Sequence, residues 1–251
     1  MKPLLIALTL FLSCFIAPAS AADLTCFELR TYHAAEGKLE ALQARFRDHT
    51  VALFEKHGMT NLIYWVPQAN ESNTLVYLLA YPDKAARETS WKAFQADPEW
   101  GAAKEASEAN GKLITKVESL FLSRTDYSPA LPIKAGKAPR LFEMRRYTTL
   151  PGKLEALDTR FRDHTIALFA KHGMENLLYF HLDEGQEGSE NTLLYFLAHE
   201  SAESLTASFY AFREDPTWIA ARDASEKDGK LLIEKGVAST LLKATDFSPV
   251  K

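Results

Sequence analysis

The chain has 251 residues, of which 47% are hydrophobic and 25% are charged, a mixture typical of folded globular proteins. The 29 Lys and Arg residues nearly balance the 33 Asp and Glu residues, so the formal net charge is -4. These figures exclude a disordered chain, a collagen-like chain and a disulfide-rich scaffold. Because the two signs of charge are interspersed, they also argue against a nucleic acid as the partner.

Residues 1–22 have the pattern of a secretory signal peptide. Lys2 precedes an apolar stretch that ends in small residues, and the stretch is shorter than the ~20 residues that a membrane-spanning helix needs. We therefore expect a periplasmic or secreted protein with no stable membrane span after cleavage. The alternative is an uncleaved anchor, or an anchor that carries a lipid at Cys14. Cleavage would leave Cys26 as the single cysteine, so we expect no internal disulfide.

The rest of the sequence is an internal repeat. The segment RFRDHTVALFEKHGM at 45–59 recurs as RFRDHTIALFAKHGM at 160–174, and FELRTY at 27–32 recurs as FEMRRY at 142–147. The second copy has three additional residues before its NTLLYFLAH segment. Repetition at this length predicts two domains of ordinary size, 23–127 and 140–251. Between them lies a predicted linker, 128–139, that is rich in Pro, Ala, Gly and Lys.

Apolar periodicity predicts the elements of the first copy in chain order. Strands are expected at 24–33, 61–66, 74–81 and 112–123, and helices at 36–57, 83–95 and 97–110. Gly58 suits the end of the first helix, and Asp83 suits the N-cap of the second. The order β-α-β-β-α-β is that of a ferredoxin-like unit, which has an antiparallel four-stranded sheet with helices on one face.

The second face of each sheet also has to be buried if it is apolar. We therefore predict an α+β protein in which two ferredoxin-like βαββαβ domains pack sheet to sheet, with the helices outside. In this arrangement domain 1 pairs with domain 2 inside one chain, and the two sheets enclose a shared interior.

The ELRTY strand, the Gly-Lys helix start, the LFEKHG segment and the DPEW turn, each with its counterpart in the second copy, resemble the NIPSNAP family. The resemblance covers nearly all of the chain after residue 22 and implies a dimeric α/β barrel closed within one chain. It implies no reaction. Related dimeric α/β-barrel families include haem-degrading and polyketide-type monooxygenases, which is an analogy of fold.

The first strand of each copy carries the candidate ligand-binding residues. Because side chains alternate across a sheet, the apolar set is expected to face the helices and the polar set to point between the two sheets. The polar residues are Glu28, Arg30, Tyr32, Glu143, Arg145 and Tyr147. They predict either a pocket for a small anionic or aromatic ligand, with Arg as the carboxylate fork, or a structural Glu–Arg ion pair.

His49 and His164 lie on the apolar stripe of the first helix in each copy, and this position predicts that they face the sheet. They are the catalytic candidates, as a general base or a haem ligand. The alternative is a core histidine with a satisfied hydrogen bond.

Motifs for metal, nucleotide or nucleophile chemistry are missing from the sequence. We therefore expect no metal and, apart from a possible haem, no cofactor. The expected function is small-molecule binding or an accessory role without an assigned activity. The alternatives are a monooxygenase-type enzyme that uses His49 or His164, and a protein-interaction module.

Overall fold

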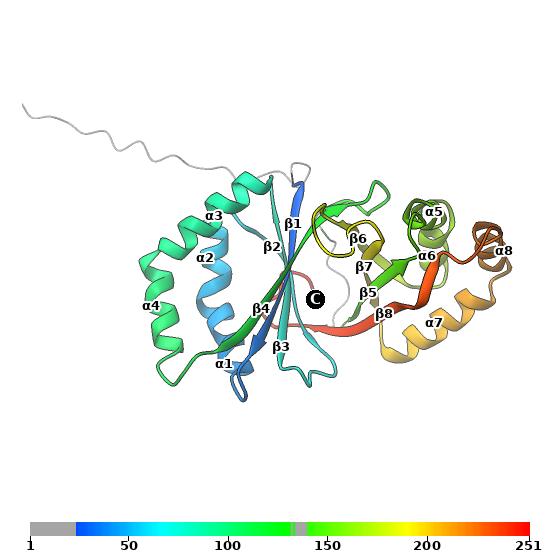
Figure 1. The fold of residues 1–251 in the computed structure, drawn as a ribbon. Coiled ribbons are helices and arrows are strands. Elements are labelled where there is room, and N and C mark those ends of the chain that lie inside the picture. The colour runs from blue at the N-terminus through cyan, green and yellow to red at the C-terminus, as the bar shows by residue number, and fades with distance from the viewer. Residues whose placement is uncertain (1–23, 132, 134–139) are drawn as a thin grey trace, which may run out of the picture.

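The structure is a computed structural model, and it describes residues 24–131, 133 and 140–251. The predicted signal peptide lies outside the described residues, as does most of the predicted linker. Figure 1 shows the two halves side by side, with the helices at the two ends and the strands between them. Within the described ranges, no helix is both long enough and apolar enough to cross a membrane.

Each half repeats the same order of elements, and every element predicted for the first copy is present. The first half contains β1 (Cys26–Ala34), α1 (Leu39–Arg45), η2 (Phe46–Thr50), α2 (Val51–Lys56), β2 (Thr60–Pro67), β3 (Thr74–Tyr81), α3 (Lys84–Ala96), α4 (Pro98–Ser107) and β4 (Ile114–Arg124). The second half contains β5 (Leu141–Thr149), α5 (Leu154–Arg160), η3 (Phe161–Thr165), α6 (Ile166–Lys171), β6 (Glu175–Leu182), β7 (Thr192–His199), α7 (Ala202–Glu214), α8 (Pro216–Ser225) and β8 (Leu232–Ala244).

Local sequence signals explain where the helices begin and end. Asp83 accepts a hydrogen bond from the Ala86 backbone N–H at 2.7 Å and caps α3, as predicted. Asp97 caps α4 in the same way by accepting from the Glu99 N–H at 2.8 Å. After α2 the chain turns at Gly58, whose φ of 78° lies in the left-handed region that favours glycine.

The first helix of each half differs from the prediction, because a π-helical turn interrupts it. In η2 the hydrogen bonds span five residues instead of four, which shifts the residues that follow around the helix axis. Phe46 and Thr50 therefore face the core, whereas His49 is exposed. The prediction that His49 and His164 face the sheet is wrong, since η3 exposes His164 in the same way.

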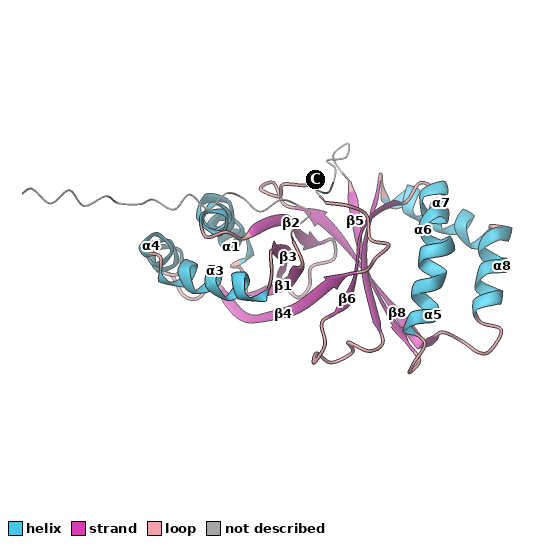
Figure 2. Cartoon of the chain, turned by 90° about the horizontal axis from the view of Figure 1, so that it is seen from above, coloured by secondary structure: helices cyan, strands magenta, loops and turns pink. Residues whose placement is uncertain are grey.

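The eight strands form one closed antiparallel barrel in the order β1-β3-β2-β8-β5-β7-β6-β4. The halves join at both edges, where β2 pairs with β8 and β4 pairs with β6. Figure 2 shows α1, α3 and α4 on one side of the strands and α5 to α8 on the other. The expected mixed α/β barrel with outside helices, formed by pairing of the two halves within the chain, is confirmed.

The barrel interior is filled by apolar side chains from both halves. The Trp65 and Phe196 rings stack with their centroids 5.1 Å apart, and Phe27 meets Phe180 at the same distance. Phe27 and Leu29 of β1 point into this interior. The prediction that the apolar set of the first strand faces the helices is therefore wrong.

The polar set of each first strand faces the helices instead. Tyr32 packs against the core between the sheet and the helices, and Glu28 is hydrogen-bonded to Arg87 and Trp91 of α3. The physical reason is that strands alone surround the interior and line it with apolar side chains, so a buried carboxylate there would have no counter-charge. The helices supply that partner.

The longer turn of the second half, before β7, crosses to the first half. The Gln186 side chain accepts a hydrogen bond from the Phe121 N–H at 2.9 Å and donates one to the Phe121 carbonyl at 2.6 Å. The side chain thus satisfies the backbone of β4 where it leaves its pairing with β1 for β6. The lengthened turn has a structural role in joining the halves.

Candidate ligand pocket between the sheet and the helices

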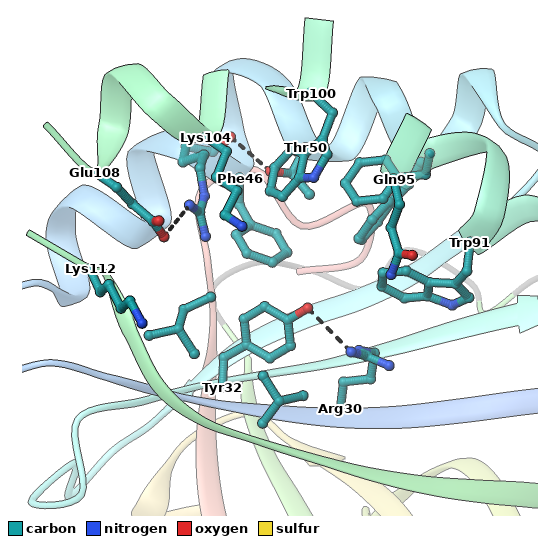
Figure 3. A pocket seen from close by; sticks show the side chains of 15 residues that line it. Arg30, Tyr32, Phe46, Thr50, Trp91, Gln95, Trp100, Lys104, Glu108 and Lys112 are labelled. Atoms are coloured by element: carbon teal, nitrogen blue, oxygen red, sulfur yellow. Dashed lines mark hydrogen bonds and ion pairs between the residues drawn. The ribbon is translucent and has the colours of Figure 1, made fainter. Parts of the chain in front are cut away.

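A cavity of about 490 Å³ lies between the sheet and the helices of the first half (Figure 3). Its wall combines aromatic rings with basic and polar groups. The lining residues are Arg30, Tyr32, Arg45, Phe46, Thr50, Phe54, Trp91, Phe94, Gln95, Trp100, Lys104, Glu108, Lys112, Ile114 and Val117. Two of the six predicted ligand-binding residues, Arg30 and Tyr32, therefore border this cavity, on the helix side of the sheet.

Several segments position the polar and aromatic groups, among them β1, α3 and η2. Strand β1 supplies Arg30 and Tyr32, which lie side by side because they are two residues apart on one face. Helix α3 supplies Trp91 and Gln95, which are four residues apart and share one face. Figure 3 shows this pair on the side of the cavity nearest Arg30. The π-helical turn η2 presents Phe46 to the same space.

Behind the cavity, the fully buried Glu28 carboxylate is held by donors from four elements, one of which is the Tyr81 hydroxyl of β3 at 3.2 Å. Arg87 donates to it at 2.9 and 3.1 Å, and the Trp91 indole N–H donates at 3.2 Å. Arg30 and Ser119 donate as well. Burial alone would raise the pKa of this carboxyl, but the Arg87 hydrogen bonds, the Arg30 charge and the Ser119 hydrogen bond lower it to about 2. Glu28 is therefore ionised at neutral pH.

Arg30 connects this buried carboxylate to the cavity. Besides its ion pair with Glu28, it donates from Nε to the Tyr77 hydroxyl at 3.0 Å and from Nη2 to the Tyr32 hydroxyl at 3.3 Å. Its guanidinium lies over the Trp91 ring, 4.3 Å from the centroid. A guanidinium has five N–H groups, so two are left without an acceptor among the described residues. These can donate to a ligand.

In the second half, Glu143 and Arg145 form the same ion pair, and His199 stands where the first half has Tyr81. Glu143 accepts from Ser239 at 2.6 Å and lies 3.1 Å from His199 Nε2. Arg145 donates to the hydroxyls of Tyr195 at 2.9 Å and Tyr147 at 3.2 Å. Burial alone would raise the pKa of Glu143, but His199, Arg145 and Ser239 lower it. The structural ion pair that the sequence suggested is thus present in both halves.

The NIPSNAP family model matches residues 27–129 and again 142–249. The chain belongs to the NIPSNAP family. No curated protein matches the sequence.

Solved structures resemble this NIPSNAP chain at low sequence identity. A candidate monooxygenase from Lactobacillus acidophilus is 13% identical, with a TM-score of 0.57 over 90% of this chain and 99% of that chain. An anthrone oxidase-like protein is 13% identical, with a TM-score of 0.55 over 90% and 94%. A NIPSNAP domain protein from Burkholderia xenovorans is 23% identical and covers 41% of this chain and 98% of its own, with a TM-score of 0.37. At these identities the first two show a shared fold.

The two NIPSNAP regions differ at most positions of the helix after β3 and β7, including the face that borders the cavity in the first region. Relative to α3, helix α7 carries leucine for Arg87, phenylalanine for Trp91 and arginine for Gln95. The arginine, Arg213, lies over the Phe209 ring at 6.0 Å from its centroid. The second region therefore lacks an indole donor at this position and has a cation where the first has an amide.

Arg87, Trp91 and Gln95 were not predicted as site residues. Their spacing by four places them on one helix face. The sequence does not single out this face, however, because ten of the thirteen positions of α3 differ from their counterparts in α7.

Neither catalytic candidate lies in the cavity. His49 is exposed and does not border it, and His164 borders a surface depression of about 550 Å³ on the outside of α5 and α8. Among residues 24–131, 133 and 140–251, no three His, Cys, Asp or Glu side chains are grouped as metal ligands.

Proposed function

We propose that this NIPSNAP protein binds a small aromatic molecule in the cavity of its first half, while the second half completes the barrel. One observation carries the proposal: six aromatic side chains and the Arg30, Tyr32 and Gln95 hydrogen-bonding groups converge on one cavity of about 490 Å³. The size falls within the ~300–1,000 Å³ of ordinary small-molecule sites. The rings offer stacking surfaces, and the few polar groups would fix the orientation of the ligand.

Two finer points belong to the same proposal. Each half would be a ferredoxin-like unit, which the β-α-β-β-α-β order supports.

The protein would work outside the cytoplasm, which the signal-like pattern of residues 1–22 supports. N-terminal sequencing of protein recovered from the periplasm or the medium tests the second point. A chain that stays inside the cell with its first residues intact would contradict it.

A second candidate function is oxygenation of the bound molecule. It is favoured by the shared fold with the candidate monooxygenase and by the Tyr32 hydroxyl beside the Arg30 guanidinium in the cavity wall. That pair could hold a phenol or enol as its anion, the form that reacts with oxygen. Oxygen consumption with phenolic ligands tests this candidate. For haem, the cavity lining contains one residue of a type that ligates haem iron, Tyr32, and no histidine, cysteine or methionine.

The binding proposal predicts that the second half's residues weaken binding in the first, because phenylalanine removes the indole stacking surface and arginine is bulkier than glutamine. The double variant Trp91→Phe with Gln95→Arg copies those residues, so it should fold but bind 2-naphthol, a neutral aromatic probe, at least about tenfold more weakly. Isothermal titration calorimetry measures this affinity.

The matched control is the reciprocal change in α7, Phe209→Trp with Arg213→Gln. It should leave the affinity for 2-naphthol at the first-half site unchanged. Equal binding by the wild type and by the α3 double variant would contradict the proposal. Native mass spectrometry of the purified protein would add a direct search for a bound natural ligand.

A further inference from the structure

We infer that the ligand is an aromatic anion, and that its carboxylate or sulfonate lies at the cavity mouth between Lys104 and Lys112. This inference rests on the proposed function and names the class of molecule for the same cavity. Lys104 and Lys112 were not among the six ligand-binding candidates that the first strands of the two copies supplied.

The charges around the cavity do not cancel. Four basic side chains line it and only one acidic side chain does. Arg30 is paired with Glu28, and Arg45 is paired with Glu108 at 3.1 Å. Two positive charges are left, Lys104 and Lys112, and neither forms an ion pair with a described residue.

In the second half, the basic residues at the equivalent positions form ion pairs. Lys230, the counterpart of Lys112, donates to Glu226 at 2.7 Å, and the same carboxylate pairs with Arg160 at 3.1 Å. Arg222, the counterpart of Lys104, pairs with its neighbour Asp223 at 2.8 Å. The first half keeps equivalent carboxylates, Glu105 and Glu108, yet neither pairs with the lysines. Among the described residues, lysines without an ion pair at these positions are thus a feature of the first half.

The positions of the groups orient the ligand. Lys104 comes from α4 and Lys112 from the segment before β4, and Figure 3 shows both beside Glu108, across the cavity from Trp91 and Gln95. An anion between the lysines would place its aromatic body against Phe46. A carbonyl or hydroxyl at the far end would reach the free N–H groups of Arg30. An aromatic acid with a hydrogen-bond acceptor opposite its charged group has this shape.

The test compares two probes that share one ring system and differ in charge. At neutral pH and low salt, 2-naphthoate should bind about tenfold more tightly than 2-naphthol, since two exposed ion pairs each add a few-fold. Salt at about 0.5 M should remove most of that difference through screening. In the double variant Lys104→Gln with Lys112→Gln, the affinity for 2-naphthoate should fall to the affinity that the same variant shows for 2-naphthol.

The matched control is Arg222→Gln with Lys230→Gln in the second half, which should keep the wild-type preference for 2-naphthoate. Equal affinities of the wild type for the two probes would overturn the inference and leave the proposed binding site intact. A preference for 2-naphthoate that survives in the Lys104 and Lys112 variant would also overturn it. Binding of neither probe would overturn both the inference and the proposed function.

Discussion

Replacing Glu28 by glutamine is expected to lower the free energy of unfolding by about 3–5 kcal/mol, the cost of breaking a buried ion pair from one side. The carboxylate is fully buried and balances two arginines, Arg30 and Arg87, whose side chains are 11% and 15% exposed. Glutamine keeps the shape but not the charge, so Arg30 would lose its counter-charge and Arg87 would keep only its pair with the exposed Glu88 at 2.8 Å. Urea denaturation of the wild type and the variant measures the loss.

Glu143→Gln in the second half is the matched control. Glu143 balances one arginine, Arg145, and its other partner is His199, which can be neutral. The loss should therefore be smaller than that for Glu28→Gln. Equal losses for the two variants, or an unchanged midpoint for Glu28→Gln, would contradict this account of the ion-pair network.

The same carboxylate should make stability depend on pH. The pKa of Glu28 in the folded protein is about 2, lowered from an ordinary value of 4.5. Since the unfolded chain takes up this proton at the higher pH, the stabilisation is complete above pH 4.5. It is lost as the pH falls from 4.5 toward 2, by about 3 kcal/mol in total. Unfolding measured from pH 7 to pH 2 should show this decrease in the wild type, and Glu28→Gln should show a smaller one.

Truncating Trp65 to alanine is the second change with a large expected effect, a loss of about 3–5 kcal/mol of unfolding free energy. Trp65 is 0% exposed and stacks on Phe196, so its indole joins the two halves inside the barrel. Removing the ring would leave a cavity between them. Thermal and urea denaturation of the whole chain measure the effect.

Trp65→Phe separates ring packing from indole chemistry. Phenylalanine is the residue at the equivalent position of the second half, Phe180. The indole N–H of Trp65 is buried and has no acceptor among the described residues, so phenylalanine also removes an unsatisfied donor. Its cost should be well below that of Trp65→Ala. Similar losses for the two variants would show that a smaller aromatic ring cannot replace the indole, contrary to this account.

Periodicity and repetition were sufficient to predict the elements and the pairing of the two halves. They could not tell which face of β1 points inward. Alternation separates Phe27 and Leu29 from Glu28 and Arg30, but both faces of this strand are covered. The decision depends on partners distant in sequence, because Glu28 can be buried only where Arg87 reaches it. Apolar patterning along one strand contains no information about that partner.

The predicted orientation of His49 and His164 was wrong because π-helical turns interrupt both helices. An ordinary helix places His49 near the stripe formed by Leu42 and Phe46, but the wider turn of η2 brings Thr50 to the core instead. The Thr50 hydroxyl donates to the Arg45 carbonyl at 3.1 Å, which satisfies a backbone acceptor inside that turn. Residue spacing alone does not distinguish the two geometries. The cavity was not predicted either, because α3 and α4, which supply part of its lining, approach β1 only in the folded chain.

The indole signals of the four tryptophans test the central claim, that the ligand cavity lies between the sheet and the helices of the first half. In two-dimensional ¹H–¹⁵N spectra, titration with 2-naphthoate should shift the indole signals of Trp91 and Trp100, which line the cavity. The signals of Trp65 inside the barrel and of Trp218 in the second half should stay in place. A titration that moved Trp65 or Trp218 while leaving Trp91 and Trp100 unshifted would contradict the account.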